Sequence, residues 1–392
     1  MSEKTINKVP NVPNLRFNNE CWMLTSLGFS CDGFDYGIAA EAKEFDGINQ
    51  YIRITDIDDD SSSYTSRNSV SPSFLDENCV CIENDILFAR TGASTGKTYL
   101  YNRNDGKLYF AGFLIRANVK PIFDPYFVFT MTKTSRYANW IKIMSARSGQ
   151  PGINAQEYKT FSFYHPSLKT QNKISKFIKN IDKRIQTQSK IIEDYSSLKK
   201  SIIDNFFNEL TNSSLGEHII EITERNGYKN EYEVLSVSNK YGFIKQNEQF
   251  EDRIIASENK SNYKVVRKNT FAYNPTRINV GSIACMHYLD IGIVSPMYLC
   301  FSTLKTLSPY YLEYYFLSKS FKLEMNKKLE GSVRMCLQID ALKKIKLYIP
   351  SLEIQNKFVN KLSCFDKKIQ KEKDILSLYK KQKAYLLQNM FI

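Results

Sequence analysis

A long internal repeat is the feature of this sequence that most constrains its fold. Residues 164–207 align without a gap onto residues 348–391, an offset of 184, and sixteen of the aligned positions are identical. The clearest stretch is Tyr-x-Pro-Ser-Leu-x-x-Gln-Asn-Lys, which begins at Tyr164 and again at Tyr348. A repeat of this length predicts a chain made of two similar halves. We expect the halves to be related by a pseudo-twofold axis.

Each copy of the repeat predicts a long helix with one apolar stripe. The Pro-Ser at its start can open a helix, because proline is tolerated in the first turn and serine can cap it. Apolar residues then follow with the 4-3 spacing of a coiled coil, and two such stripes can cover each other as an antiparallel pair. Two independent surface helices are the alternative. The expected interface comprises Ile178, Ile185, Ile192 and Tyr195 in the first copy, and Leu362, Ile369, Leu376 and Tyr379 in the second.

The rest of the chain forms two blocks with similar strand patterns. Alternation and β-branched content predict strands at residues 51–57 and 232–238, and a second matched pair at 85–90 and 269–274. We therefore expect an α+β protein of two repeated mixed α/β domains joined by two long antiparallel coiled-coil helices. The predicted boundaries are 1–165 for the first domain, 166–210 for the central helix, 211–349 for the second domain, and 350–392 for the distal helix.

Charge is distributed unevenly along the chain. The net charge is +13, and residues 166–207 and 350–392 carry much of it, at +5 each, whereas residues 1–165 carry −1. A basic balance favours a polyanionic partner, although solvated helix faces would also produce it. No apolar run reaches the roughly 18 residues of a membrane span, and the first residues lack the apolar core of a signal peptide, so we expect a cytoplasmic protein.

Motifs of catalysis and metal binding are weak in this sequence. Residues 92–98 resemble a phosphate-binding loop and, around Ser94, a nucleophile elbow, but strand-forming residues follow where both motifs need a helix. Asp124-Pro-Tyr-Phe lacks the second proline of the amino-methyltransferase motif. The eight cysteines contain no C-x-x-C and the three histidines are isolated, so no metal site is predicted. We expect no catalytic residue and no cofactor in this chain.

Two kinds of glycine-containing loop offer donors for nucleic acid. Glycine lets a backbone approach closely, arginine suits guanine, and glutamine or asparagine suits adenine. Simple glycine hairpins with exposed charges are the alternative. The candidate DNA-binding residues are Arg90, Thr91, Ser94, Lys97, Asn274, Arg277 and Asn279 in the first kind of loop, and Arg147, Gln150 and Arg334 in the second.

The chain resembles the specificity subunit of type I restriction-modification systems over nearly its whole length. The resemblance rests on residues 331–355, on the parallel stretch 148–171, on the strand and glycine loop at 85–97, and on the opening Val-Pro-Asn-Leu-Arg-Phe at 12–17. The order of block, helix, block, helix is itself distinctive. The sequence departs from the family at Lys169-Thr-Gln171 and Glu353-Ile-Gln355, which stand where a Glu-Gln pair is usual.

The resemblance implies a non-catalytic DNA-recognition subunit. Each block would be a target-recognition domain that reads one half of a split double-stranded DNA target, and the helices would set the separation of the halves. Two methyltransferase (modification) subunits and restriction, or motor, subunits would dock on this scaffold. S-adenosylmethionine and ATP with Mg²⁺ would be bound by those partners. The alternatives are a nucleotide-binding enzyme that uses residues 92–98, and a coiled-coil scaffold that binds only proteins.

Overall fold

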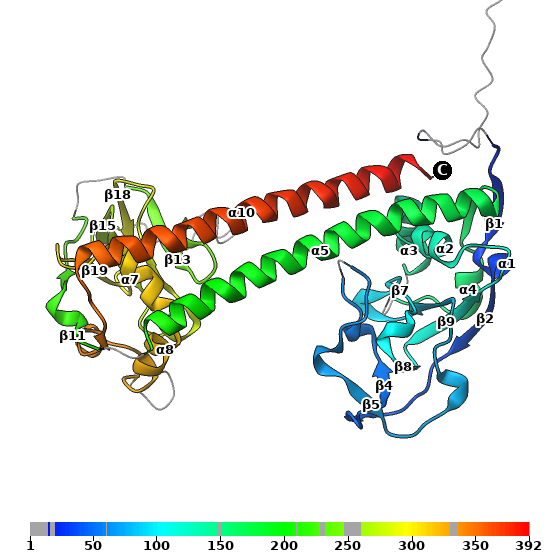
Figure 1. The fold of residues 1–392 in the computed structure, drawn as a ribbon, viewed down its shortest axis with the longest axis horizontal. Helices are drawn as coiled ribbons and strands as arrows, with labels where there is room; N and C mark the ends of the chain where they lie inside the picture. Colours follow the sequence, from blue (N-terminus) through cyan, green and yellow to red (C-terminus); the bar gives the residue numbers. More distant parts are fainter. Residues whose placement is uncertain are drawn as a thin grey trace, which may run out of the picture. The chain divides into compact units, whose positions relative to one another are not determined.

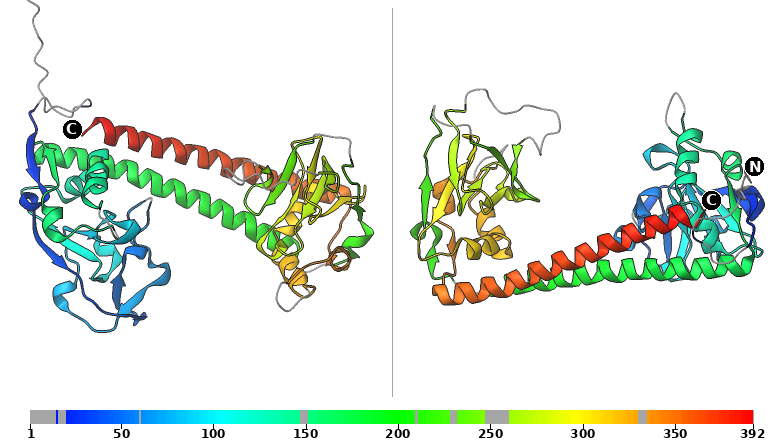
Figure 2. Two further views of the ribbon diagram at one scale, coloured as in Figure 1. Left: turned by 180° about the vertical axis from the view of Figure 1, so that it is seen from behind. Right: turned by 90° about the horizontal axis from the view of Figure 1, so that it is seen from above.

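The computed structural model describes residues 15, 20–59, 61–146, 151–208, 211–227, 232–246, 260–329 and 335–391. The chain divides into two compact units. The first comprises residues 1–190 and 374–392, and the second comprises residues 191–373. Each unit therefore contains one globular block together with half of each long helix, as the ribbon views show (Figures 1 and 2).

The first unit combines small sheets with short helices. Its strands are β1 (Met23–Ser26), β2 (Cys31–Tyr36), β3 (Ala42–Glu44), β4 (Asn49–Ile52), β5 (Val70–Pro72), β6 (Asp85–Ala89), β7 (Thr98–Leu100), β8 (Lys107–Phe110), β9 (Leu114–Val119) and β10 (Ser162–His165). Its helices are α1 (Leu27–Ser30), α2 (Pro125–Met131), α3 (Ser135–Met144), α4 (Ala155–Lys159) and the first half of α5 (Leu168–Phe206).

The second unit uses the same kinds of element. Its strands are β11 (Ser213–Ser214), β12 (Ile219–Ile222), β13 (Val234–Ser238), β14 (Gly242–Lys245), β15 (Lys264–Arg267), β16 (Thr270–Tyr273), β17 (Ile283–Cys285), β18 (Ile291–Val294), β19 (Leu299–Thr303) and β20 (Lys346–Leu347). Its helices are α7 (Pro309–Phe316), α8 (Lys319–Asn326), α9 (Ile339–Lys343) and the first half of α10 (Leu352–Asn389).

The two units repeat one topology. The four-stranded sheet of the first has the order β2-β9-β6-β7. One of the two four-stranded sheets of the second has the order β12-β19-β16-β17, and all neighbours in these two sheets are antiparallel. A parallel pair also recurs, as β4 with β8 and as β13 with β18. The predicted fold class of two repeated mixed α/β domains with long antiparallel helices is thus confirmed. The pseudo-twofold axis and the four domain boundaries stay predictions.

One predicted strand is shorter in the structure than in the sequence pattern. The strand expected at residues 51–57 ends at Ile52, because the chain turns into a short 3-10 helix at Ile54–Asp56. The Asp56 carboxylate accepts a hydrogen bond from the Arg53 backbone N–H at 2.9 Å, which stabilises this turn. A local side-chain bond of this kind competes with continuation of the strand.

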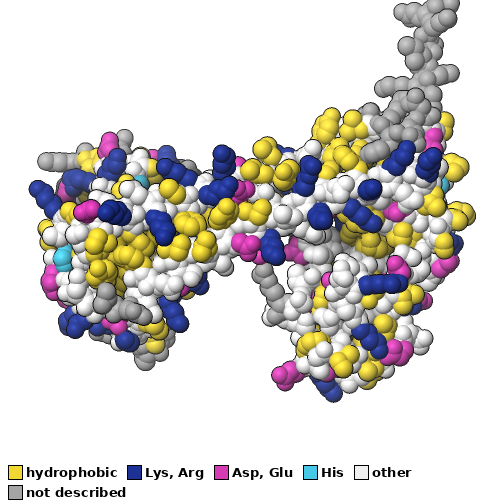
Figure 3. All heavy atoms as spheres, viewed as in Figure 1, with side chains coloured by type: hydrophobic (Ala, Val, Ile, Leu, Met, Phe, Trp, Pro, Cys, Tyr) yellow, Lys and Arg dark blue, Asp and Glu magenta, His cyan; other side chains and the backbone are white. Residues whose placement is uncertain are grey.

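Within each unit the two helix halves lie antiparallel and share a core with the globular block. In the first unit, Ile174 and Ile178 of α5 pack with Met390, beyond the end of α10, in the main apolar cluster. In the second unit, Phe206 of α5 stacks on Phe358 of α10 with ring centroids 4.0 Å apart. Lys and Arg side chains are spaced along both helices on the face that Figure 3 shows.

Two lysines at equivalent positions of the apolar stripes, Lys199 and Lys383, each form an ion pair with the other helix. Lys383 forms an ion pair with Asp182 at 2.5 Å in the first unit, and Lys199 forms one with Asp366 in the second. These are the same two positions of the repeat with the helices exchanged, since 199 and 383, like 182 and 366, differ by 184. Of the predicted interface residues, Ile178, Leu362 and Ile369 are buried, and Ile185, Ile192, Tyr195, Leu376 and Tyr379 are half-buried.

Candidate nucleic-acid interface

The loop after β6 is a hairpin that leads directly into β7. The Ala89 N–H donates to Lys97 O at 2.8 Å, and the Gly96 N–H donates to Ala89 O at 2.9 Å. Gly92 and Gly96 have φ values of 76° and 90°, a region in which glycine is favoured. A phosphate-binding loop and a nucleophile elbow both need a helix after the glycines, whereas here β7 follows. The structure therefore supports neither enzymatic interpretation of this loop.

Arg90 is held in a fixed position at the start of this hairpin. Its Nε–H donates to Gly112 O at 3.0 Å, and its guanidinium lies over the Tyr36 ring with 5.0 Å to the ring centroid. The side chain is half-buried. An arginine held by Nε and an aromatic face keeps its two terminal nitrogens in a fixed plane, which is the arrangement that bidentate recognition of guanine or phosphate uses.

The second loop of the first unit is tied to the first by main-chain bonds. The Gly92 N–H donates to Pro151 O at 3.0 Å, and the Ile153 N–H donates to Arg90 O at 2.9 Å. Thr91, which is half-buried like Ser94, forms an isolated β-bridge with Gly152. The two loops, which the sequence presented separately, thus meet at one edge of the unit. Arg147 and Gln150, the candidates in the second loop, lie outside the described residues.

Lys97 is engaged with a neighbouring segment of its own unit. Its ammonium donates to Ile57 O at 2.6 Å and pairs with Asp59 at 2.6 Å, and its side chain is only 14% exposed. These partners place the Lys97 ammonium against the segment that follows β4. A contact between the Lys97 ammonium and DNA would first have to break both bonds.

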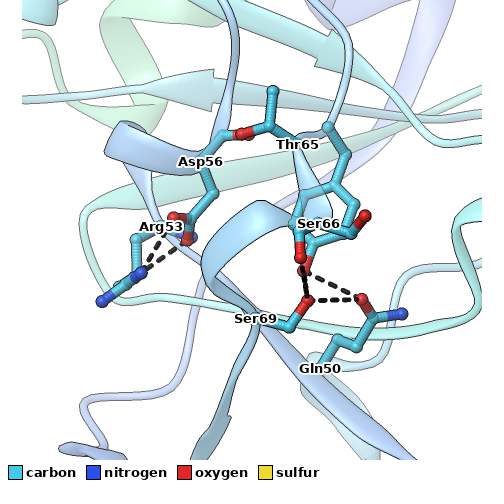
Figure 4. Close-up of polar contacts among 7 residues, drawn as sticks. Gln50, Arg53, Asp56, Thr65, Ser66 and Ser69 are labelled. Atoms are coloured by element: carbon cyan, nitrogen blue, oxygen red, sulfur yellow. Dashed lines mark hydrogen bonds and ion pairs between the residues drawn. The ribbon is translucent and has the colours of Figure 1, made fainter. Parts of the chain in front are cut away.

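A polar network shapes the segment that accepts the Lys97 ammonium (Figure 4). Arg53 makes a two-point contact with the Asp56 carboxylate, at 2.9 Å and 2.8 Å. The Ser69 hydroxyl bonds to Ser66 O and to the Gln50 side-chain oxygen, at 3.0 Å and 3.3 Å. These bonds connect residues within the segment that runs from β4 to β5. They give the Ile57 carbonyl a fixed position for Lys97.

The corresponding loop of the second unit, between β16 and β17, exposes two of the three candidates. Asn274 is buried, and its side-chain oxygen accepts hydrogen bonds from the Thr276 backbone and hydroxyl at 3.1 Å and 2.9 Å. Arg277 and Asn279 are exposed at the rim. Asn274 therefore forms the turn, while Arg277 and Asn279 face solvent.

The second loop of this unit is tied to the first in the same manner. The Leu337 N–H donates to Pro275 O at 3.0 Å, and the Tyr273 hydroxyl donates to Leu337 O at 3.1 Å. Leu337 is the repeat counterpart of Ile153, at an offset of 184. Arg334, which precedes it, lies outside the described residues. In both units, main-chain bonds thus join the first glycine-containing loop to described residues that follow the second.

Two buried glutamines, which the sequence pattern marked only as a departure, position the start of each long helix. Gln171 accepts from the Asp124 N–H at 3.0 Å and donates to Pro166 O at 3.0 Å. Gln355 accepts from the Ser308 N–H at 2.8 Å and donates to Pro350 O and Thr306 O, at 2.9 Å and 3.0 Å. The two glutamines therefore join the helix starts to α2 and α7.

An apolar hollow of about 770 Å³ lies beside the start of α5 in the first unit. Its rim exposes Met23, Leu24, Phe29 and Ile122, each by more than half. Sequence reasoning missed this surface, because its members come from β1, α1 and the residues before α2. Exposed apolar surface of this kind is typical of protein interfaces.

The fold and the two loop edges define a protein built from two similar units. A family model, the type I restriction modification DNA specificity domain, matches residues 37–194 and 209–378. The chain belongs to this family and carries two copies of its domain. It is a DNA sequence-recognition subunit for a two-part target, and the predicted family is confirmed.

Solved structures with the same fold are distant in sequence. The type I restriction-modification S subunit from M. genitalium has a TM-score of 0.56 at 17% identity, with 97% of this chain and 99% of that chain covered. A chain from work on complex assembly and conformational transition of the type I R-M system has a TM-score of 0.54 at 15% identity, with 93% and 96% covered. No curated protein matches the sequence. None of the described helices has the length and apolar content of a membrane span.

Proposed function

We propose that the first unit reads its half of the DNA target with the edge where its two loops meet, and that Arg90 contacts a base there. The observation that carries this proposal is the main-chain bonding of the two loops, which recurs in both units. Arg90 is fixed by Gly112 O and the Tyr36 ring, so little side-chain entropy is lost on binding. Thr91 and Ser94 would contact phosphates beside it.

In the second unit, Arg277 and Asn279 take the base-reading role. Both are exposed on the loop between β16 and β17, and arginine and asparagine are suited to guanine and adenine. Asn274 and Lys97 act as positioning residues, because their polar groups are bonded within their own units. Arg147, Gln150 and Arg334 stay predicted contacts on the adjoining loops.

Methylation by the assembled complex tests these assignments. Arg90→Ala should reduce methylation of the specific target and relax base preference at one position of the first half-site. Loss of one bidentate contact corresponds to about 1–3 kcal/mol, or roughly 5- to 150-fold. Arg103→Ala is the matched control, because Arg103 is an exposed arginine at the far end of β7 and pairs with Glu83.

The outcome at the second unit completes this test. Arg277→Ala should relax base preference in the other half-site and leave the first unchanged. If both variants retained full affinity and base preference, the two loop edges would not be the DNA-reading surface. A uniform loss on every sequence, with a reduced salt slope, would assign these arginines to phosphates instead.

We further propose that a modification subunit docks on the apolar hollow beside α5. The exposed side chains of Met23, Leu24 and Phe29 supply the apolar centre that a protein interface needs. Two modification subunits and restriction, or motor, subunits complete the proposed assembly. S-adenosylmethionine and ATP with Mg²⁺ bind to those partners, and the cytoplasm, where the DNA is, would be the place of action.

A further inference from the structure

A cluster of three potential metal ligands lies in the second unit, away from its loop edge. Cys285 ends β17, His287 follows two residues later, and Glu313 lies on α7. One ligand atom from each residue lies within 4.8 Å of the other two. The sequence pattern predicted no metal site, because Glu313 is 26 residues from His287 and only the fold brings it near.

The hydrogen bonding of the His287 ring is incomplete among the described residues. The two ring nitrogens differ: Nε2 lies 2.7 Å from the Glu313 carboxylate, whereas Nδ1 is buried and has no hydrogen-bond partner among the described residues. The ring is stacked on Tyr310, with 4.8 Å between centroids and 6° between planes. Tyr310 and Glu313 are three residues apart, so they share one face of α7.

We propose that Cys285, His287 and Glu313 bind one Zn²⁺ ion that fastens β17 to α7. Thiolate, imidazole and carboxylate are all zinc ligands, and a tetrahedral site places such atoms about 3.4–3.6 Å apart. Side-chain movement of roughly 1 Å would bring the three groups to this spacing from their present separations. Cys285 is 5% exposed at the base of the site, and the side chains of His287 and Glu313 are about one-third exposed at its rim. Solvent can therefore enter and supply a fourth ligand.

Zinc binding releases the proton of the Cys285 thiol. Burial and the nearby Glu313 carboxylate raise the pKa of the Cys285 thiol, so the metal-free thiol is protonated at neutral pH. Zn²⁺ forms a Zn–S bond as the S–H bond breaks, and the proton passes to solvent, so zinc affinity rises with pH. In the first unit, Tyr99 pairs with Leu87, and Tyr101 lies opposite Asp85 on the equivalent strands. These two tyrosines occupy the positions that Cys285 and His287 occupy in the second unit. The zinc site is thus particular to the second unit.

Cobalt binding to the full chain tests the proposal. The experiment uses a Cys21→Ser/Cys364→Ser background, because both thiols are exposed and could bind metal adventitiously. Co²⁺ should bind with one ion per chain and produce a thiolate-to-cobalt charge-transfer band, and Zn²⁺ should displace it. Cys285→Ser should abolish the band, whereas Cys336→Ser, a matched control in the same unit, should retain it.

Two further variants keep the test decisive if Cys285→Ser fails to fold. His287→Asn and Glu313→Gln lie at the partly exposed rim, and each should weaken cobalt binding about tenfold or more. Zinc should raise the unfolding temperature of the background protein, and should raise that of these variants less at the same zinc concentration. Absence of a thiolate band in the background protein, or an unchanged band in Cys285→Ser, would overturn the proposal.

Discussion

The start of α5 and the start of α10 are built on the same buried glutamine but present different surfaces. Gln171 and Gln355 bond to equivalent backbone groups and are both almost fully buried. Around Gln171, Met23, Leu24, Phe29 and Ile122 are exposed and border the apolar hollow. Before the globular blocks the repeat has an offset of 188, since Ser26-Leu-Gly aligns with Ser214-Leu-Gly. The counterparts of the first three residues are therefore Thr211, Asn212 and Glu217, and that of Ile122, at the offset of 184, is Thr306.

Near the start of α10, Glu217 and Thr306 belong to a polar network with Ser213 and His218. The Ser213 hydroxyl donates to Glu217 at 2.6 Å and lies 2.8 Å from His218, and the other His218 nitrogen lies 2.7 Å from the Thr306 hydroxyl. The second unit therefore has a self-contained polar surface where the first has an apolar one. The buried bonds of the repeat are therefore retained, while its outer face is free to specify different contacts.

The largest expected effect tests whether the two glutamines are equivalent. Gln171→Leu and Gln355→Leu should each lower the free energy of unfolding by about 3 kcal/mol, because each leaves a buried N–H and a buried carbonyl without a partner. Gln186→Leu, on the exposed side of α5, is the control and should change stability little. Urea unfolding measures all three. If Gln171→Leu left the free energy of unfolding unchanged and Gln355→Leu lowered it, the two helix starts would not be equivalent.

The next effect tests whether the apolar hollow is a docking surface. Met23→Asp should weaken binding of the modification subunit to the chain by about tenfold or more, because it puts a charge into an apolar interface. Its counterpart variant, Thr211→Asp, should have a smaller effect. Calorimetric titration measures both, with unfolding curves as the folding control. Equal losses would contradict a distinct role for the hollow.

A half-buried lysine in the first unit, Lys133, provides a third contrast. Burial, together with Lys383 and Lys97, lowers the pKa of Lys133 to about 7, and Asp182 opposes the shift. The unfolded chain therefore holds this proton more tightly, so the stability penalty is complete below about pH 7 and declines as pH rises toward the ordinary lysine pKa. Lys133→Met should be most stabilising near pH 6, with an advantage that narrows by at most about 1.4 kcal/mol per pH unit above pH 7.

The repeat counterpart of Lys133 supplies the control for this prediction. It is Leu317, which precedes α8 as Lys133 precedes α3, and it is 54% exposed. Leu317→Met should leave the pH dependence of unfolding unchanged. A Lys133→Met variant whose stability parallels that of the wild type from pH 6 to pH 9 would show that this lysine keeps an ordinary pKa.

The smallest effect concerns the two ion pairs between helices. Double-mutant cycles on Lys383 with Asp182 and on Lys199 with Asp366 should each give a coupling of about 0.5 kcal/mol, because both pairs are partly solvated. Methionine at the lysines and asparagine at the aspartates retain most of the side-chain volume. Coupling in only one unit would mean that the repeated pair stabilises one helix pairing and is incidental in the other.

The sequence was sufficient for the parts of the fold that depend on local periodicity. The 4-3 spacing predicted both long helices, and the alternation around residues 85–90 and 269–274 predicted β6 and β16. It could not show that Lys199 and Lys383, which interrupt the apolar stripe, would each meet an aspartate of the other helix. That pairing depends on the antiparallel register, which no single helix encodes.

The site was less predictable than the fold, because side-chain exposure is set by tertiary contacts. Arg90 and Asn274 occupy equivalent positions after their strands, yet Arg90 lies over Tyr36 and Asn274 is buried in a turn. Lysine is a residue type that commonly binds phosphate, but the Lys97 ammonium is bonded to Ile57 O and Asp59. The Cys285 cluster is missed for the same reason, since Glu313 reaches it only through the packing of α7.

The aspartate at each ion pair also accepts a hydrogen bond from the globular block. Tyr126, in α2, donates to Asp182, and Tyr314, in α7, donates to Asp366. The tyrosines stand at different positions of their helices, so the block can change while one carboxylate still receives a phenol. A foreign recognition block grafted onto these helices would thus need to bring a single phenol to that carboxylate, which is a modest requirement for exchanging one specificity for another.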